Sequence, residues 1–293
     1  WNPAGAPTIY KLLEALDDTA HERRIVFTCK EETALCSGRR DREVAVEGLS
    51  GRLFVLAGEP RFPKWLGRLR HYLCEARQTW RALSHYRRYR PDLVYVDRGN
   101  MWTAGLLARL VDAPVVYRVM GISPGFRHVM AGNRPSQVLS RWLIRAPFTT
   151  VICTQDGSGG EIWLDRMLHA GVPRLMLMNG VAAAAKSPTP TAAGPMTVLF
   201  IGRLEDLKGC DEFLTAFLGA WTREPEALRA LVVGGGSRLA ELRRRVAEAG
   251  AEGAVTFTGE IPPAEVLDHY RRADLYVSLN RMCNLTNTNL EAL

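Results

Sequence analysis

The chain of 293 residues is 47% hydrophobic and 24% charged, a balance that is typical of globular proteins and excludes disordered and collagen-like classes. Its formal net charge of +7 favours anionic partners such as nucleotides, phospholipid head groups or nucleic acid. No run of 18 apolar residues occurs, and the six cysteines form neither a C-x-x-C pair nor a metal spacing. We therefore expect no transmembrane helix, no signal peptide and a reducing, cytoplasmic location.

Strands and helices alternate along residues 1–181. Residues 30–50 are charged and poorly patterned. The expected strands lie at 25–29, 52–56, 91–97, 113–119, 149–153 and 174–178, and the expected helices at 7–16, 63–90, 103–111, 137–144 and 162–170. Alternation of this kind predicts a parallel α/β sheet.

The helix expected over 63–90 is long and amphipathic. Its remaining positions are heavily basic, and its apolar residues recur at three- and four-residue steps: Trp65, Leu69, Tyr72, Leu73, Ala76, Trp80 and Leu83. In the interpretation we favour, the apolar face packs on a sheet and the basic face is solvated. In the other, residues 64–90 form a peripheral contact with the inner face of an anionic membrane.

A change of composition at residues 182–195 predicts a linker, because Ala, Pro, Thr, Ser, Lys and Gly follow one another without a period. The pattern then restarts, with strands expected at 198–201, 228–233, 254–258 and 274–279 and helices at 211–220, 238–249 and 264–272. The sequence therefore predicts an α/β protein of two doubly wound, Rossmann-like domains, over 1–181 and 196–293. Since the chain starts at Trp1 and ends where a helix begins, we expect a fragment that lacks a first strand and is truncated in its second domain.

The stretch Val198–Gly209 is the strongest local signal in the chain. Four apolar residues predict a buried strand that Gly202 ends, and Arg203, Lys208 and Gly209 follow before a helix with Asp211 as N-cap or first-turn acid. A guanidinium, an ammonium and the N–H groups of a helix start suit a phosphate or pyrophosphate. The alternative is a surface loop with two solvated charges.

Further loops follow the other strands of the second domain. They are Gly234–Gly236, Gly259–Ile261 and Asn280–Asn287. Because the carboxyl ends of parallel strands meet at one edge of a sheet, these loops and Gly202 should rim the same cleft. The segment Asn284–Glu291 is rich in short polar groups that would present donors there, with Glu291 as an acceptor for hydroxyls. No D-x-D, no His/Cys/Asp cluster and no Ser/His/Asp set stands out, so no metal site is expected.

Together these pieces resemble glycosyltransferase family 4, whose members have the two-domain GT-B fold. The resemblance spans most of the chain and rests on five segments: Phe200–Gly209, Leu231–Gly236, Val255–Ile261, Tyr270–Val277 and Asn284–Leu293. Asn179–Val181 also resembles the boundary between the family's domains. The order and spacing of the segments are specific, although no single segment is.

The resemblance implies a retaining, metal-independent hexosyltransferase without a cofactor, which uses a nucleotide-diphosphate sugar as co-substrate. It implies that Arg203 and Lys208 bind the pyrophosphate and stabilise the leaving group, as catalytic residues. The implied donor-binding residues are Gly202, Gly234, Gly235, Gly259, Glu260, Ile261, Asn284, Thr286, Asn287 and Glu291. The loop 259–261 would meet the base and Glu291 the ribose diol, while Gly5 would lie where acceptor and donor phosphate meet.

The sequence departs from the family pattern at two positions. The first acid of the E-x7-E motif falls at Cys283, and the family's histidine falls at Met120. Asn284, Thr286 and Asn287 would replace the sugar contacts of the missing carboxylate. On the acceptor side the further candidates are Arg118 and, as weaker ones, Asp156 and Ser158.

The leading hypothesis is sugar transfer to a glycan or lipid-linked acceptor in polysaccharide or cell-envelope biosynthesis. One alternative is a GT-B-like sugar-nucleotide epimerase, for which the sequence offers no convincing acid–base set. Another is a non-catalytic sugar-nucleotide-binding protein that has lost the histidine and the first acid. Nucleic-acid binding is suggested only by charge, and no recognition motif supports it.

Overall fold

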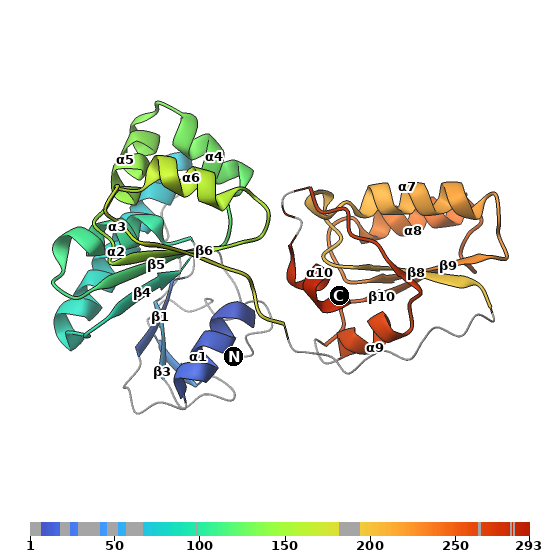
Figure 1. Cartoon of the computed structure of the whole chain (residues 1–293), viewed down its shortest axis with the longest axis horizontal. Coiled ribbons are helices and arrows are strands. Elements are labelled where there is room, and N and C mark those ends of the chain that lie inside the picture. The colour runs from blue at the N-terminus through green and yellow to red at the C-terminus, as the bar shows by residue number, and fades with distance from the viewer. Residues whose placement is uncertain are drawn as a thin grey trace. The chain divides into compact units, whose positions relative to one another are not determined.

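A computed structural model of the chain describes residues 7–17, 24–28, 42–45, 52–56, 67–97, 99–181, 194–262, 265–281, 283 and 285–293. The contacts between residues divide the chain into two units. Unit 1 comprises residues 1–154 and 159–177, and unit 2 comprises residues 155–158 and 178–293 (Figure 1). Of the linker predicted at 182–195, only residues 194 and 195 lie within the described part.

From residue 52 onward, unit 1 alternates strands and helices as expected. Its strands are β1 (Arg24–Thr28), β2 (Arg42–Ala45), β3 (Arg52–Leu56), β4 (Val94–Asp97), β5 (Val115–Val119), β6 (Thr150–Thr154) and β7 (Arg174–Leu177), and its helices are α1 (Pro7–Asp17), α2 (Gly67–Tyr89), α3 (Met101–Leu110), α4 (Pro124–Ala131), α5 (Pro135–Ile144) and α6 (Gly160–Met167). Strands β4, β5, β6 and β7 form a parallel sheet in chain order. In a smaller sheet β3 pairs in parallel with β1 and antiparallel with β2.

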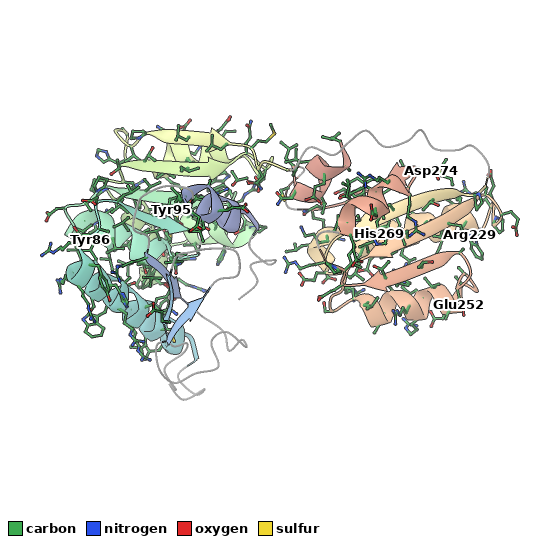
Figure 2. All side chains as sticks on the ribbon, turned by 90° about the horizontal axis from the view of Figure 1, so that it is seen from below. Tyr86, Tyr95, Arg229, Glu252, His269 and Asp274 are labelled. Atoms are coloured by element: carbon green, nitrogen blue, oxygen red, sulfur yellow. The ribbon has the colours of Figure 1, made fainter. Side chains whose placement is uncertain are left out.

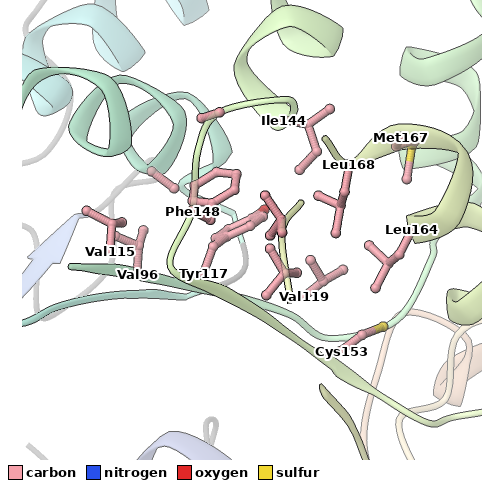
Figure 3. Close-up of a cluster of buried hydrophobic side chains, with 14 of the residues drawn as sticks. Val96, Val115, Tyr117, Val119, Ile144, Phe148, Cys153, Leu164, Met167 and Leu168 are labelled. Carbon is pink, nitrogen blue, oxygen red and sulfur yellow. The ribbon is translucent and has the colours of Figure 1, made fainter. Parts of the chain in front are cut away.

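The order β4-β5-β6-β7 explains where the helices lie. Right-handed crossovers that all progress in one direction put their helices on one face of a sheet. Figure 1 shows α3, α5 and α6 together over one face. The core of the unit fills the space beneath them, where the rings of Tyr117 and Phe148 stack 5.4 Å apart (Figure 3). Burial raises the pKa of the Tyr117 hydroxyl far above its ordinary value.

The predicted apolar face of α2 is wrong for Leu69, Ala76 and Trp80, whereas Tyr72 stacks on Trp102 of α3 and Leu83 packs against the core. Leu69 and Trp80 are 52% and 65% exposed, whereas the polar side chains of Glu75, Gln78 and Thr79 are buried. The reason is that α2 packs beside α3, which presents a hydroxyl as well as apolar groups. The Thr79 and Thr103 hydroxyls bond at 2.9 Å across this interface. The Thr79–Thr103 pair therefore occupies the buried side of α2, where the sequence pattern predicted leucine and tryptophan.

Unit 2 contains a second parallel sheet. Its strands are β8 (Met196–Ile201), β9 (Leu228–Val233), β10 (Val255–Gly259) and β11 (Leu275–Tyr276), and its helices are the 3-10 turn η2 (Asp206–Lys208), α7 (Cys210–Trp221), α8 (Leu239–Glu248), α9 (Val266–Arg271) and α10 (Asn287–Ala292). The strands lie in the order β10-β9-β8-β11. The two parallel α/β sheets confirm the predicted fold class.

The winding of unit 2 reverses after β10. The chain moves outward from β8 to β9 and β10 and then returns past β8 to β11. Figure 1 accordingly shows α7 and α8 on one face of the sheet and α9 on the other. Asp274, labelled in Figure 2, fixes the start of β11, because its carboxylate accepts a 2.7 Å hydrogen bond from the Thr197 amide.

Several boundaries differ from the expectations. Strand β2 lies inside the poorly patterned segment 30–50. Helix α4 was not expected, although the sequence carries a start signal for it: the Ser123 side chain accepts a hydrogen bond from the Phe126 amide as N-cap, and Pro124 is the first helical residue. The expected strand 274–279 shortens to Leu275–Tyr276, so that Ser278 lies in a loop. No helix in the described part of the chain is long and apolar enough to cross a membrane.

Candidate functional site

A pocket of about 180 Å³ lies at the carboxyl ends of β8 and β11, the neighbouring strands at which the strand order reverses. Open α/β sheets hold ligands at this kind of switch point. The pocket is lined by Phe200, Ile201, Gly202, Arg203, Lys208, Ser278, Asn280, Thr286 and Thr288. The motif after β8 and the polar segment near residue 286, which are far apart in sequence, therefore meet.

The loop from β8 to α7 supplies two cations to the pocket. Arg203 is 72% exposed and donates a 3.4 Å hydrogen bond to the Glu205 carboxylate. Lys208 is half-buried at the end of η2, and its amide bonds the Glu205 carbonyl at 2.8 Å. Within the described residues no carboxylate lies within ion-pair distance of the Lys208 ammonium. One wall of the pocket is therefore positively charged and suited to an anion.

Backbone hydrogen bonds join the loop after β8 to the loops after β9 and β10. The Leu204 amide donates to the Gly235 carbonyl at 2.8 Å, and the Gly234 amide donates to the Gly259 carbonyl at 2.9 Å. Gly234 has a φ of 130°, and a Cβ there would lie 2.0 Å from the Gly202 carbonyl oxygen. Only glycine allows this approach. The three strand-end loops are thus one interlocked layer.

A second close approach fixes η2 against the segment after β11. Gly209 has a φ of 74°, and a Cβ there would lie 2.3 Å from the Leu279 carbonyl oxygen. The Arg281 amide donates to the Leu207 carbonyl at 3.0 Å, and the Arg281 side chain forms an ion pair with Glu212. These contacts bring Asn280 and Lys208 to the same pocket.

The opposite wall is neutral, with hydroxyl and amide groups. The Thr286 hydroxyl accepts from the Asn289 amide at 3.3 Å and thereby caps α10. Two tyrosines, whose rings meet edge to face at 5.4 Å, hold this segment. The Tyr270 hydroxyl donates to the Thr288 carbonyl at 2.7 Å, and the Tyr276 hydroxyl donates to the Asn289 side-chain oxygen at 2.9 Å. Burial, and secondarily Tyr276 and Glu291, raise the pKa of Tyr270 far above its usual value.

Cys283, at the position of the first motif acid, is half-buried beside this wall. Its sulfur accepts a 3.4 Å hydrogen bond from the Asn280 amide group. Burial raises the pKa of the Cys283 thiol, and the Asp156 carboxylate adds to this effect while Lys208 opposes it. A neutral thiol therefore stands where the family pattern has a carboxylate.

Behind the cationic loop lies an ion-pair network that sequence reasoning missed. The Arg238 guanidinium donates to both oxygens of Asp211, at 2.9 and 2.7 Å, and Arg245 reaches the same carboxylate at 3.3 Å. The Arg238 hydrogen bonds hold the pKa of Asp211 below its ordinary value. Gly209 is the N-cap of α7, so Asp211 is its first-turn acid. The Arg238 amide donates to the Leu204 carbonyl at 3.0 Å and so supports the loop.

The remaining donor-side candidates lie outside the set of pocket-lining residues. Gly235 lies under the Glu260 side chain, Ile261 is half-buried, and Glu291 is exposed on α10 near Tyr270. The Asn287 side-chain oxygen accepts from the Asn179 amide group at 2.8 Å. Asn284 and Gly5 lie outside the described residues.

The acceptor-side candidates fall in different units. Arg118 pairs in register with Asp97 at the ends of β5 and β4 in unit 1, beside Tyr95. Asp156 belongs to unit 2, where its carboxylate accepts from the Ser158 amide at 2.9 Å and its carbonyl from the Leu285 amide at 3.0 Å. The Asp156 carboxylate thus stabilises its own loop.

Ser278, Asn280 and Thr288 line the pocket but were not named individually by the sequence reasoning. The signal for Asn280 was present, because the polar segment that starts there follows the last strand. Ser278 was hidden inside an expected strand. In the described part of the chain, no group of three His, Cys, Asp or Glu residues is arranged to hold a metal.

Two family profiles match the chain. The profile for a glycosyl transferase 4-like domain matches residues 4–192, and that for glycosyl transferases group 1 matches residues 183–293.

Curated relatives match in part or at low identity. Mannosylfructose-phosphate synthase of Agrobacterium fabrum is 37% identical over 103 residues, which are 33% of this chain and 23% of the relative. Glycogen synthase of Mycobacterium tuberculosis is 25% identical over 287 residues, 92% of this chain and 67% of the relative. Alpha-monoglucosyldiacylglycerol synthase of Streptococcus pneumoniae is 29% identical over 239 residues, which are 73% of this chain and 52% of the relative. The match therefore spans between about a quarter and two thirds of these relatives.

Solved structures share the fold at low sequence identity. Sucrose-phosphate synthase from Thermosynechococcus elongatus superposes with a TM-score of 0.70 at 17% identity, over 97% of this chain and 72% of that one. Trehalose-6-phosphate from E. coli bound with UDP-2-fluoro glucose superposes with a TM-score of 0.67 at 11% identity, over 97% of this chain and 78% of that one. The fold is therefore GT-B-like, with two parallel α/β sheets.

Proposed function

Because the chain belongs to the glycosyl transferase 4-like family of group 1 glycosyltransferases, we propose that it transfers a hexose from a nucleotide-diphosphate donor whose diphosphate binds between β8 and β11. The observation that carries this proposal is the pairing of a cationic wall with a neutral one. Lys208 has no carboxylate partner among the described residues, and the facing groups are hydroxyls and an amide. Such a site favours a phosphate over a cation.

In the proposed reaction the bond between the anomeric carbon and the diphosphate oxygen breaks, and an acceptor hydroxyl oxygen bonds to that carbon and gives up its proton. Negative charge gathers on the departing diphosphate, which can take up that proton. Arg203 and Lys208 donate hydrogen bonds to that charge and so stabilise the transition state more than the ground state. The interlocked glycine loops hold these donors in place before the charge develops. The proposed roles of these residues involve no metal ion. We also propose that the configuration of the anomeric carbon is retained.

The other donor contacts are proposals of the same kind. Backbone groups of Gly259, Glu260 and Ile261 would meet the base, and Glu291 would accept from the ribose hydroxyls. Gly234 and Gly235 would approach the diphosphate through their backbone. The β10 end supports the first assignment, since the Gly259 carbonyl is tied to the Gly234 amide and so to the pocket loop.

A glycan or lipid-linked acceptor is proposed, with Gly5, Arg118 and Asp156 on that side. The lipid alternative draws on the likeness to alpha-monoglucosyldiacylglycerol synthase of S. pneumoniae. Leu69 and Trp80 on α2 are exposed, so residues 64–90 are one of two candidate surfaces for a peripheral membrane contact, and vesicle binding by an α2 variant tests it. The cytoplasmic location stays a prediction.

The experiment is a donor-consumption assay with the purified protein and a panel of nucleotide sugars, repeated for Arg203→Ala and Lys208→Ala. Each substitution should lose about 3–4 kcal/mol of transition-state stabilisation, a rate loss of several hundred-fold. Arg229→Ala is the matched control, because Arg229 donates to the Pro225 and Leu228 carbonyls at the opposite edge of the same sheet (Figure 2). Unchanged turnover in both pocket variants would contradict the assignment.

A non-catalytic sugar-nucleotide-binding protein is the second candidate. It is favoured by Cys283 and Met120, which stand where the family has an acid and a histidine. The Met120 sulfur accepts only a weak contact, 3.8 Å from the Thr154 hydroxyl. Nucleotide binding that needs Lys208, without donor consumption or epimerisation under any condition, would favour this candidate over the transferase and the epimerase.

A further inference from the structure

Helix α5 in unit 1 turns an apolar stripe outward. Val138, Leu139 and Trp142 are 48%, 39% and 50% exposed, and Pro135 at the helix start is exposed beside them. The spacing i, i+3, i+4, i+7 places these residues on one side of the helix. A stripe of this kind on a surface helix needs an explanation beyond the normal exposure of single apolar residues.

The buried side of α5 contains polar residues whose hydrogen bonds are satisfied. Gln137 accepts from the Arg134 amide at 2.9 Å and donates to the His128 carbonyl at 3.3 Å. Ser140 accepts from the Trp102 indole at 2.9 Å. These bonds fix the rotation of the helix, so the outward position of its apolar stripe follows from the packing of Gln137 and Ser140 inside.

Trp142 is held in its outward position by Arg109 of α3. The guanidinium lies 4.0 Å from the centre of the indole ring and donates to the Trp142 carbonyl at 2.6 Å. A further bond of 3.0 Å reaches the Gly105 carbonyl. The cation–π contact and the two carbonyls leave the indole ring oriented while half of the residue remains exposed.

The surroundings of the stripe are basic. No Asp or Glu occurs between Asp112 and Asp156, and that stretch contains Arg118, Arg127, Arg134, Arg141 and Arg145. Arg134 and Arg145 are exposed at the two ends of α5, on the flank that Arg141 shares. The apolar stripe is therefore bordered by arginines, without a carboxylate from its own segment.

We infer that α5 binds the surface of an anionic phospholipid bilayer. Val138, Leu139 and Trp142 would enter the boundary between head groups and acyl chains, where tryptophan is favoured, and Arg134 and Arg145 would meet the phosphates. The charge pattern selects this occupant, because an apolar patch for a protein partner or a second copy does not require an acid-free, arginine-bordered rim. The surface lies in unit 1 and does not depend on the donor pocket.

The test is co-sedimentation of the whole protein with phosphatidylcholine vesicles, with and without phosphatidylglycerol. The wild type should bind only the anionic vesicles, and added salt should weaken that binding. The double variant V138Q/W142Q should lose roughly tenfold in partitioning, since two apolar side chains no longer leave water. R145Q should lose about fivefold, as expected for one basic residue near an anionic surface.

The matched control is L69Q/W80Q on α2, which removes two apolar side chains that are at least as exposed, from the other candidate helix. It should bind anionic vesicles like the wild type. R134Q/R145Q repeats the test without touching the apolar stripe and guards against a folding defect in V138Q/W142Q. Three results would overturn the inference: no binding of wild type to anionic vesicles, loss only in the α2 variant, or a protein dimer in solution that V138Q/W142Q dissociates.

Discussion

The two larger sheets are built from the same strand–helix unit but differ in how the chain winds. Strands β4 to β7 follow one another in chain order, whereas β8 lies between β9 and β11 because the chain turns back after β10. The pocket lies at that reversal, between the ends of β8 and β11. The comparison shows that the position of the pocket in unit 2 follows from the order of the strands. The alternation of strands and helices along the sequence is the same in both units and would not distinguish the two sheets.

The two sheets also differ in what joins their strand ends. In unit 2, Gly234 and Gly209 allow backbone contacts that a Cβ would block. In unit 1, Asp97 and Arg118 are register partners at the ends of β4 and β5, and the Arg118 side chain lies close to the Tyr95 hydroxyl. The strand ends of unit 2 should therefore be most sensitive to replacing a glycine, and those of unit 1 to replacing a charged side chain.

The largest effect should come from Gly234→Val. The new side chain would clash with the Gly202 carbonyl, and valine is strained at a φ of 130°. We therefore expect the free energy of unfolding to fall by about 3–5 kcal/mol and nucleotide binding to be lost. Urea unfolding and a nucleotide titration would measure both. Gly219→Ala in α7 is the control, since no atom lies within 4 Å of the position of its Cβ, and it should stabilise by about 0.5–1 kcal/mol. Equal tolerance at both positions would contradict the interlocked loops.

A charge deletion in each unit sharpens the comparison further. Lys208→Met should weaken nucleoside diphosphate binding by about 1.5–3 kcal/mol, the value of a hydrogen bond to a charged group. Arg118→Met, at a strand end of unit 1, should change that affinity by less than about 0.5 kcal/mol. Isothermal titration would decide, and a larger loss in the Arg118 variant would show that the diphosphate does not bind at the β8 end.

Asp211→Asn should destabilise unit 2 by about 1–3 kcal/mol near neutral pH, because the two Arg238 bonds lose their charged acceptor. The folded-state pKa of Asp211 is lowered by Arg238. The contribution is therefore complete above the unfolded pKa of about 4 and disappears as the pH falls through the lower folded value. Denaturant unfolding of both proteins across this window should converge at acid pH. A constant difference would refute the linkage.

The smallest effect concerns two cysteines. Cys153 in unit 1 is fully buried, while Cys283 is half-buried near Lys208 and Asn280. Because burial raises the pKa of Cys283, its alkylation rate should keep rising beyond the ordinary thiol pKa of about 8.5. A bound nucleoside diphosphate should slow labelling of Cys283 and leave Cys153 unlabelled, as read by peptide mass spectrometry. If a bound nucleoside diphosphate left the labelling rate of Cys283 unchanged, Cys283 would not lie beside the nucleotide site.

The sequence predicted what depends on neighbouring residues. The strand, glycine and cations of Val198–Gly209 lie as expected, because apolar period and turn chemistry are local. The buried face of α2 was not predictable, since it depends on Thr103 of another helix. The loops after β8 and β11 were expected at one edge of the sheet, and Lys208, Asn280 and Thr286 do line one pocket. The strand order that makes β11 the neighbour of β8 depends on the return of the chain after β10, which no spacing encodes.

The central claim is tested most directly by thermal-shift titrations of the wild type and Lys208→Met with UDP, GDP, ADP and CMP. One diphosphate at about 100 times its dissociation constant should add roughly 2.7 kcal/mol of stability to the wild type, and most of that gain should vanish in the variant. Equal stabilisation of both proteins, or none with any nucleotide, would contradict a diphosphate site between β8 and β11.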